Sequence, residues 1–86
     1  MTRPQDAPLL AALETQHREL AVLLVRLQRA RSDVLPPPAT HWRGSARHAY
    51  DSALDALGLT MDAGIAAARS ARDRTRLAIS EVASRA

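Results

Sequence analysis

Apolar side chains recur every three or four residues in the first third of the chain, and this spacing places them on one face of an α-helix. Glu14 and Arg26 fall on the opposite face. Asp6 or a nearby polar residue can cap the helix, and Pro8 suits its first turn because the amide hydrogen that proline lacks would be unpaired there. The pattern predicts a helix over residues 8–33. Its buried seam is formed by Leu10, Leu13, His17, Leu20, Leu24 and Leu27, and it is widened by Leu9 and Leu23.

Three consecutive prolines, at positions 36–38, interrupt the helical pattern. Each lacks an amide hydrogen and disfavours helix in the residue before it, so residues 34–44 are predicted to form a stiff corner. The next helix begins after this corner, with either Thr40 or Ser45 as its cap. The pattern alone leaves both starts open.

A second helix is predicted over residues 45–84, where only Gly58 and Gly64 weaken the helical pattern. It carries two adjacent stripes, and the sequence leaves open which of them faces the first helix. The bulky stripe contains Tyr50, Leu54, Leu57, Met61, Ile65, Ala68 and Ile79. The small stripe contains Ala49, Ala53, Ala56, Thr60, Ala63 and Ala67, and would allow a neighbouring helix to approach closely.

The lengths of the two helices suggest an assembly. At 1.5 Å per residue they are about 39 and about 60 Å long. If the two helices are aligned at the corner, the far end of the first helix lies beside residue 70 or so of the second. Ile79 and Val82 would then have no cover from their own chain. The sequence thus predicts an all-α fold, in which residues 1–86 form an antiparallel two-helix hairpin that pairs with a second hairpin into a four-helix bundle. Packing within or between hairpins is expected of Leu13, Leu20, Leu24, Leu27, Leu54, Leu57, Met61, Ile65 and Ile79.

Composition points the same way. A chain of 86 residues forms at most one domain, and alanine supplies 18 of its apolar residues while phenylalanine and cysteine are absent. Alanine favours helix but buries little area, and no disulfide or thiolate metal site can compensate. Burial against a partner is the remaining source of stability.

All 12 basic residues are arginine, yet the net charge is only +3. Such a mild excess does not define a nucleic-acid-binding protein, and the arginine and alanine bias is also typical of a GC-rich genome. A small helical DNA-binding protein is nevertheless the alternative hypothesis, and an amphipathic hairpin lying on anionic membranes ranks behind it. No stretch resembles a cleaved signal peptide or approaches the ~20 apolar residues of a membrane span, so no stable membrane insertion is expected.

Candidate chemistry is sparse. Without a cysteine nucleophile, a glycine-rich phosphate loop or a Ser-His-acid set, the chain is not expected to be an enzyme or to hold a cofactor. His17 lies in an apolar stripe and is expected to pack there, while His41 and His48 flank the corner as surface residues with no metal set completed around them. Asp62, Asp73 and Glu81 interleave with the arginines at 69, 72, 74 and 76, and successive arginines point in different directions around the helix, which favours a solvated face over a phosphate site.

Trp42, Arg43 and Gly44 stand at the corner between the two long amphipathic helices. In a chain of this size without cysteine, this arrangement resembles the Trp-X-Gly (WXG) family of small type VII (ESX-type) secretion substrates. The likeness in architecture spans almost the whole chain, whereas the motif itself rests on Trp42 and Gly44. A tryptophan covering the end of the bundle and a glycine permitting a turn are compatible with that reading.

The resemblance implies a cytoplasmic helical dimer that is secreted folded, without a cleaved signal peptide, by a type VII secretion ATPase. One chain of such a pair carries a C-terminal Tyr-x-x-x-acid signal next to the partner's Trp-X-Gly turn. Here the only tyrosine is Tyr50, early in the second helix, and Leu54 takes the place of the acid. This departure implies that the chain contributes the turn and an unlike chain the signal, so a heterodimer is favoured and a homodimer is possible. The partner's identity and the role after export are left open.

Overall fold

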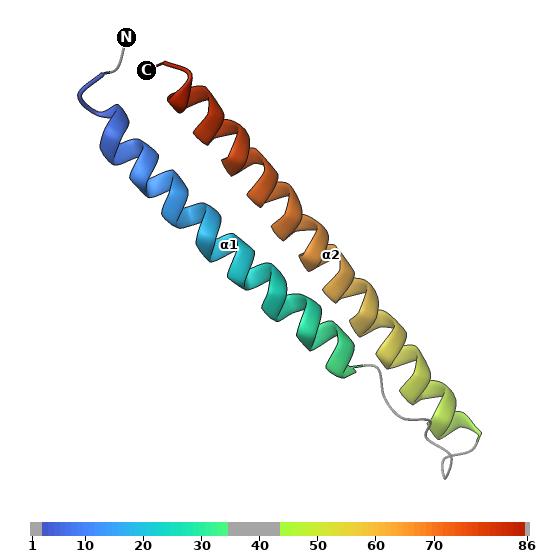
Figure 1. Ribbon diagram of the computed structural model, residues 1–86. Coiled ribbons are helices and arrows are strands. Elements are labelled where there is room, and N and C mark those ends of the chain that lie inside the picture. The colour runs from blue at the N-terminus through green and yellow to red at the C-terminus, as the bar shows by residue number, and fades with distance from the viewer. Residues whose placement is uncertain (1–2, 35–43, 86) are drawn as a thin grey trace.

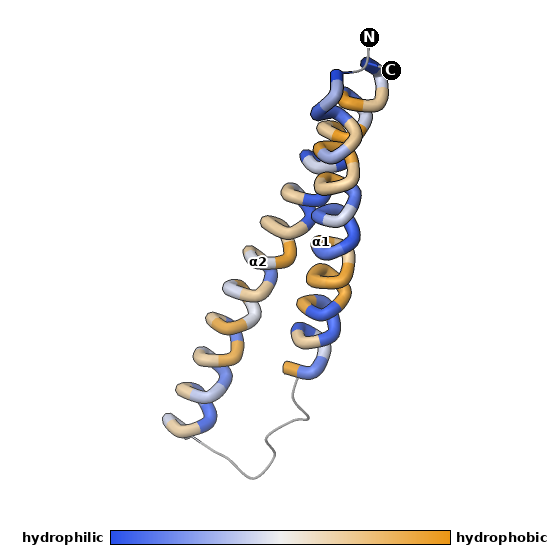
Figure 2. The backbone as a smooth tube through the Cα atoms, turned by 90° about the vertical axis from the view of Figure 1, so that its left-hand side faces the viewer, coloured by the Kyte–Doolittle hydropathy of each residue, from blue (hydrophilic) through white to orange (hydrophobic). Residues whose placement is uncertain are grey.

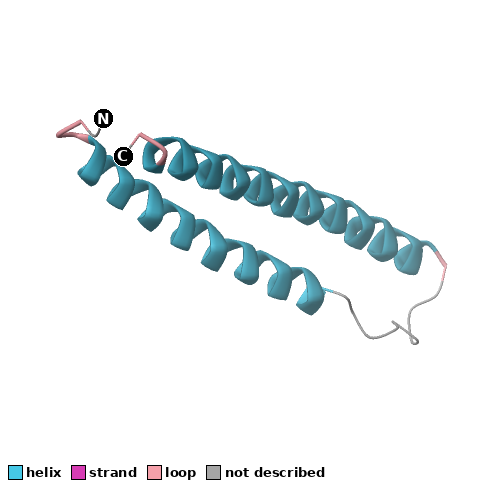
Figure 3. Ribbon diagram, turned by 45° about the horizontal axis from the view of Figure 1, so that its top comes forward, coloured by secondary structure: helices cyan, strands magenta, loops and turns pink. Residues whose placement is uncertain are grey.

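Two helices run antiparallel in the computed structural model of the protein, which describes residues 3–34 and 44–85 (Figure 1). Helix α1 spans Asp6–Val34 and helix α2 spans Ser45–Ala83. They form a rod with principal extents of 67 × 14 × 14 Å, and Figure 3 shows no strand along its described length. The prediction of an all-α antiparallel hairpin is confirmed. The proline triplet, Thr40, His41 and Trp42 lie outside the described residues.

The start of α1 is built around Asp6. The Arg3 amide donates a hydrogen bond to Asp6 Oδ2 at 3.0 Å, and the Asp6 amide donates to the Arg3 carbonyl, also at 3.0 Å. This is the return half of a capping box, with Pro4 in the turn that leads into α1, where no amide hydrogen is needed. Asp6 is only 3% exposed, and its Oδ1 lies 3.6 Å from Arg85 Nη1 at the far end of α2. The carboxylate therefore joins the start of one helix to the end of the other.

Helix α2 begins with Gly44 in the cap position. The His48 amide donates to the Gly44 carbonyl at 3.1 Å, and no side chain supplies a cap hydrogen bond. The predictions of Thr40 or Ser45 as cap are therefore wrong. Gly44 has φ +69° and ψ −138°, a backbone conformation that side chains disfavour, so the glycine itself makes the sharp entry into the helix.

We expect Gly44→Ala to lower the free energy of unfolding by about 1–3 kcal/mol, because an added Cβ is strained at this φ and ψ although it meets no atom within 4 Å. Ser45→Ala, one residue on, is the matched control and should change stability by less than about 0.5 kcal/mol. Urea denaturation followed by circular dichroism measures both. Equal midpoints for the two variants would contradict the assigned backbone conformation.

The helices meet along a seam in which inward positions alternate by three and four residues, as in a coiled coil. Its buried centre is Leu24, Ile65 and Ala68, with Leu27 packed against it. Most of the bulky stripe of α2 therefore faces α1. Every member of the small stripe is exposed. Figure 2 shows apolar residues recurring between hydrophilic ones along both helices. In α1 the seam contains Asp6, Leu10, Leu13, His17, Leu20, Leu24, Leu27, Arg31 and Val34, and in α2 Leu54, Gly58, Met61, Ile65, Ala68, Arg72, Thr75, Ile79 and Val82.

The alignment of the two helices along their common axis, here called their level, contradicts one prediction. Val82 is only 7% exposed and Ile79 is half-buried, so the expectation that neither has cover from its own chain is wrong. The prediction assumed helices level at the corner, whereas the ion pair between Asp6 and Arg85 makes them level at the opposite end. The unequal length therefore appears as an overhang of α2 at its beginning, next to the connection.

Polar contacts along the seam explain this level. The Gln16 side-chain amide donates a hydrogen bond to Thr75 Oγ1 at 2.9 Å, and the Thr75 hydroxyl donates one to the Ala71 carbonyl at 2.8 Å. Thr75 is only 4% exposed, and its hydroxyl thus both accepts and donates a hydrogen bond. Further along, Arg31 Nε donates to Asp62 Oδ1 at 3.0 Å. A slide of one heptad would keep the apolar pattern but break these pairs, and a buried polar group without a partner is costly.

Candidate partner-binding side of the hairpin

The hairpin leaves much of its surface uncovered. Its accessible surface is 6449 Å², whereas a compact monomer of 9.3 kDa is expected to expose about 5,000 Å². The excess, about 1,450 Å², is larger than the ~800 Å² that one partner contributes to a stable protein interface. Within the described residues, the only buried apolar side chains are Leu24, Ile65, Ala68 and Val82. The expectation of a small core is therefore confirmed, and a second chain could cover the exposed area.

The two sides of the seam differ in character. On one, here called the charged side, Arg31 pairs with Asp62, and Glu14, Asp55, Arg69 and Arg76 lie along the same edges. The opposite edge, here called the apolar side, carries mainly apolar and small residues. Leu9, Leu23 and Leu57 are 41%, 44% and 44% exposed on it. The positions of the apolar side are Leu9, Gln16, Leu23 and Ala30 in α1 and Tyr50, Leu57, Gly64, Ala71 and Ala78 in α2.

Three exposed leucines lie on the apolar side, each at the position just before an inward residue of the seam, whereas the more exposed Leu59 and Leu77 lie on other faces of α2. Leu9, Leu23 and Leu57 precede Leu10, Leu24 and Gly58 in the chain. In helical bundles such flanking positions are covered when a third or fourth helix packs alongside. This side is therefore the candidate surface for a partner helix.

The two glycines of α2 serve different purposes. Gly58 is buried in the seam, where an added Cβ would lie 3.1 Å from Arg31 Nη2, so its lack of a side chain lets the arginine lie across α2 and reach Asp62. Gly64 stands on the apolar side, and a Cβ there would meet nothing within 4 Å. Nothing in its own chain explains why position 64 is glycine.

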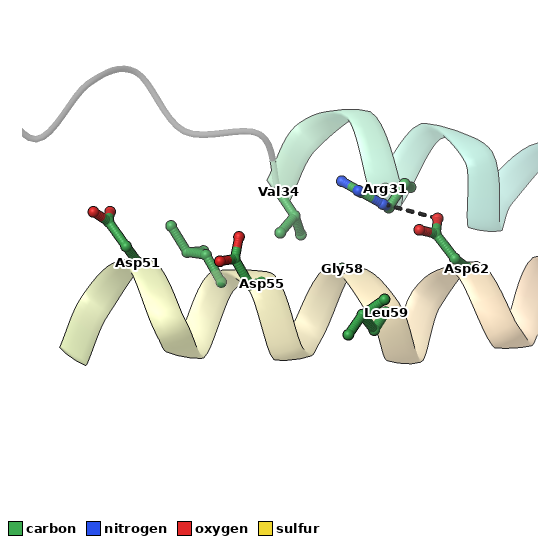
Figure 4. A pocket seen from close by; sticks show the side chains of 8 residues that line it. Arg31, Val34, Asp51, Asp55, Gly58, Leu59 and Asp62 are labelled. Carbon is green, nitrogen blue, oxygen red and sulfur yellow. Dashed lines mark hydrogen bonds and ion pairs between the residues drawn. The ribbon is translucent and has the colours of Figure 1, made fainter. Parts of the chain in front are cut away.

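A hollow of about 660 Å³ lies where α1 ends against α2, next to the connection (Figure 4). Val34, Leu54 and Leu59 form its apolar wall, and Asp51, Asp55 and Asp62 line its edge. Arg31 already neutralises Asp62, and Arg47 lies 3.8 Å from Asp51. Across the described part of the chain no group of three histidines, cysteines or acids is placed to hold a metal ion. The hollow is thus a partly charged surface recess rather than a built ligand site.

The predicted packing residues divide into two groups. Leu24 and Ile65 are buried in the seam, and six others are half-buried along it: Leu13, Leu20, Leu27, Leu54, Met61 and Ile79. Leu57, in contrast, is nearly half exposed on the apolar side, and Gly58 takes the inward position beside it. For the predicted turn, Gly44 has the required positive φ and Trp42 lies outside the described residues.

Sequence reasoning missed the polar members of the seam. Asp6, Arg31 and Thr75 occupy inward positions that apolar periodicity does not mark. The signal that could have found them is the strict alternation of three and four residues, which continues through Arg31 on α1 and through Gly58, Arg72 and Thr75 on α2.

None of the helices, over the residues described, is long and apolar enough to cross a membrane. Comparison of the chain with known protein families, curated proteins and solved structures gives no match. Functional inference therefore rests on the hairpin itself.

Proposed function

We propose that the protein is a small type VII secretion substrate or partner subunit, exported as a folded helical dimer, whose Trp42–Gly44 turn forms part of a composite export signal. The observation that carries the proposal is the position of Gly44. It adopts a conformation reserved for glycine at the entry to α2, two residues after the only tryptophan, in a hairpin whose apolar side is uncovered. Turn and open side are the two features that such a subunit needs.

The dimer would bury the apolar side. Leu9, Leu23 and Leu57 expose apolar area that a second helical hairpin could cover, at about 25 cal/mol for each Å² removed from water. Leu54 rather than an acid follows four residues after Tyr50, which favours an unlike hairpin as the exported partner, and a second copy is the other form. The type VII secretion ATPase would recognise the assembled pair at the turn.

Export of the paired chain tests this function. In cells with an active type VII system, Trp42→Ala should reduce the secreted fraction at least tenfold while the protein still forms its dimer, because the turn is expected to supply recognition rather than packing. Immunoblots of culture supernatant and cell lysate measure export, and light scattering of the purified complex measures pairing. Leu59→Ala, which removes a side chain that is 72% exposed away from the turn, is the control. Normal export of Trp42→Ala would overturn the proposed role of the turn.

Four of the 12 arginines are paired with aspartates, which lowers the charge that the DNA-binding alternative can use. Arg31, Arg47, Arg72 and Arg85 each lie within 4 Å of an aspartate, at 3.0, 3.8, 3.4 and 3.6 Å. Charges neutralised in this way release few counterions from a nucleic acid. A titration against mixed-sequence DNA separates the two hypotheses: tight binding that weakens steeply with added salt would favour the alternative.

A further inference from the structure

Gly64 occupies a position at which nothing in its own chain requires a glycine. Glycine is the poorest helix former except proline, and an alanine here would meet no atom within 4 Å in its own chain. The residue is half-buried on the apolar side, in the same line as the exposed Leu57. A glycine at such a point allows the backbone of another helix to approach closely.

Gly64 is also the midpoint of α2, with 19 helical residues on either side of it between Ser45 and Ala83. Side chains along its line are large before Gly64 and small after it. The large residues Tyr50 and Leu57 precede Gly64, and the small residues Ala71 and Ala78 follow it, at equal intervals of seven. Such a line is complementary to itself when reversed.

We propose that α2 packs antiparallel against α2 of a second copy of this chain, with the two helices crossing at Gly64. Reversal about this point places Leu57 opposite Ala71 of the partner subunit and Tyr50 opposite Ala78 of the partner subunit. Each large side chain then meets a small one, as close packing requires. The contact is isologous and closes on itself as a dimer.

Charges next to this line are compatible with the pairing. The adjoining exposed line of α2 contains Arg74 and Glu81, which the same reversal places level with Leu54 of the partner subunit and Arg47 of the partner subunit. No like charges are brought together. The overhang at the beginning of each α2 also gains cover, because it lies beside the end of the partner's α2, where both partner helices are level.

The inference rests on the proposed function and deepens it by naming the second hairpin as another copy of this chain. It replaces the preference for a different hairpin as the partner. It does not depend on export. The size pattern and Gly64 belong to this chain alone, so the pairing should form in the purified protein.

Single-cysteine variants test the crossing point directly, because the chain has no native cysteine. Under mild oxidation Gly64→Cys should form disulfide-linked dimers at least tenfold faster than Ser70→Cys, which is exposed on the outer face of α2. Mixed Leu57→Cys and Ala71→Cys chains should cross-link to each other more than either does to itself. These two positions are about 21 Å apart along one helix, too far for a bond within a chain. Equal rates for Gly64→Cys and Ser70→Cys would overturn the proposal.

Sedimentation equilibrium gives a second, independent readout. Gly64→Leu should raise the dissociation constant of the dimer about tenfold to hundredfold by overfilling the crossing point, whereas Ala63→Leu, on the exposed outer face, should leave it unchanged. Circular dichroism verifies that both variants stay helical. An unchanged dissociation constant for Gly64→Leu, or a wild-type chain that is monomeric alone and pairs 1:1 with an unlike hairpin, would overturn the inference and leave the proposed function standing. Cross-linking through Gly64 together with normal export of Trp42→Ala would support the inference and overturn the proposed function.

Discussion

Replacing Leu24 by alanine is expected to lower the free energy of unfolding by about 2–5 kcal/mol, the usual cost of a buried leucine. Leu24 is 5% exposed and lies with Ile65 and Ala68 at the centre of the seam. The neighbouring side chains, Leu27, Ile65 and Ala68, are held in place by the two helices, so they cannot close over the cavity that the substitution leaves. At roughly 0.05–0.15 kcal/mol per residue, a chain of 86 residues has about 4–13 kcal/mol in total, so the variant should lose a large part of its stability.

Leu59→Ala is the control for this loss. It makes the same chemical change at a side chain that is 72% exposed, and is expected to change stability by less than about 0.5 kcal/mol. Urea denaturation followed by circular dichroism, at one fixed protein concentration because dimerisation adds to stability, compares the two variants. If both variants unfolded at the same urea concentration, the core would not lie between the helices at Leu24.

The face that each helix buries could be predicted from sequence because it follows from spacing alone. Leu13, Leu20 and Leu24 recur at helical intervals, and only one face of α1 contains them all. The same reasoning reached Met61 and Ile65 on α2. It failed at Leu57, because the stripe drawn through bulky residues drifted from the inward line, which passes through the smaller Gly58. The repeat of three and four residues would have identified Gly58 as the inward position, whereas side-chain size pointed to Leu57.

The level of the helices could not be predicted because a heptad pattern looks the same after a slide of seven residues. The apolar spacing alone does not distinguish such registers, so polar pairs between the helices help to select one. Gln16 meets Thr75 and Arg31 meets Asp62 only in the observed register. Which of these pairs form depends on distances between atoms of different helices, and no local pattern contains that information. The choice of sides has the same origin, since Gly64 acquires meaning only once Leu57 is known to lie exposed beside it.

Charge at Val82 tests the register most directly. The alignment predicted from sequence leaves the last turns of α2 uncovered. In the structure Val82 is 7% exposed, and Arg85 Nη1 lies 3.6 Å from Asp6 Oδ1 at the start of α1. We expect Val82→Asp to lower the free energy of unfolding by about 3 kcal/mol, because a carboxylate placed there would be buried without a partner. Part of this cost can be avoided if the end of α2 frays, so hydrogen exchange of the amides at residues 75–83 should also accelerate.

Ala83→Asp is the matched control, because it introduces the same charge one residue on, at a position that is exposed. It should shift stability by less than about 0.5 kcal/mol and leave exchange at residues 75–81 slow. The difference between the two variants isolates burial at Val82 from the general effect of a negative charge near a helix C-terminus, which both share. Indistinguishable urea midpoints and exchange rates would mean that α1 does not reach the end of α2. The helices would then be level at the connection, with the overhang and its need for a partner at the opposite end of the rod.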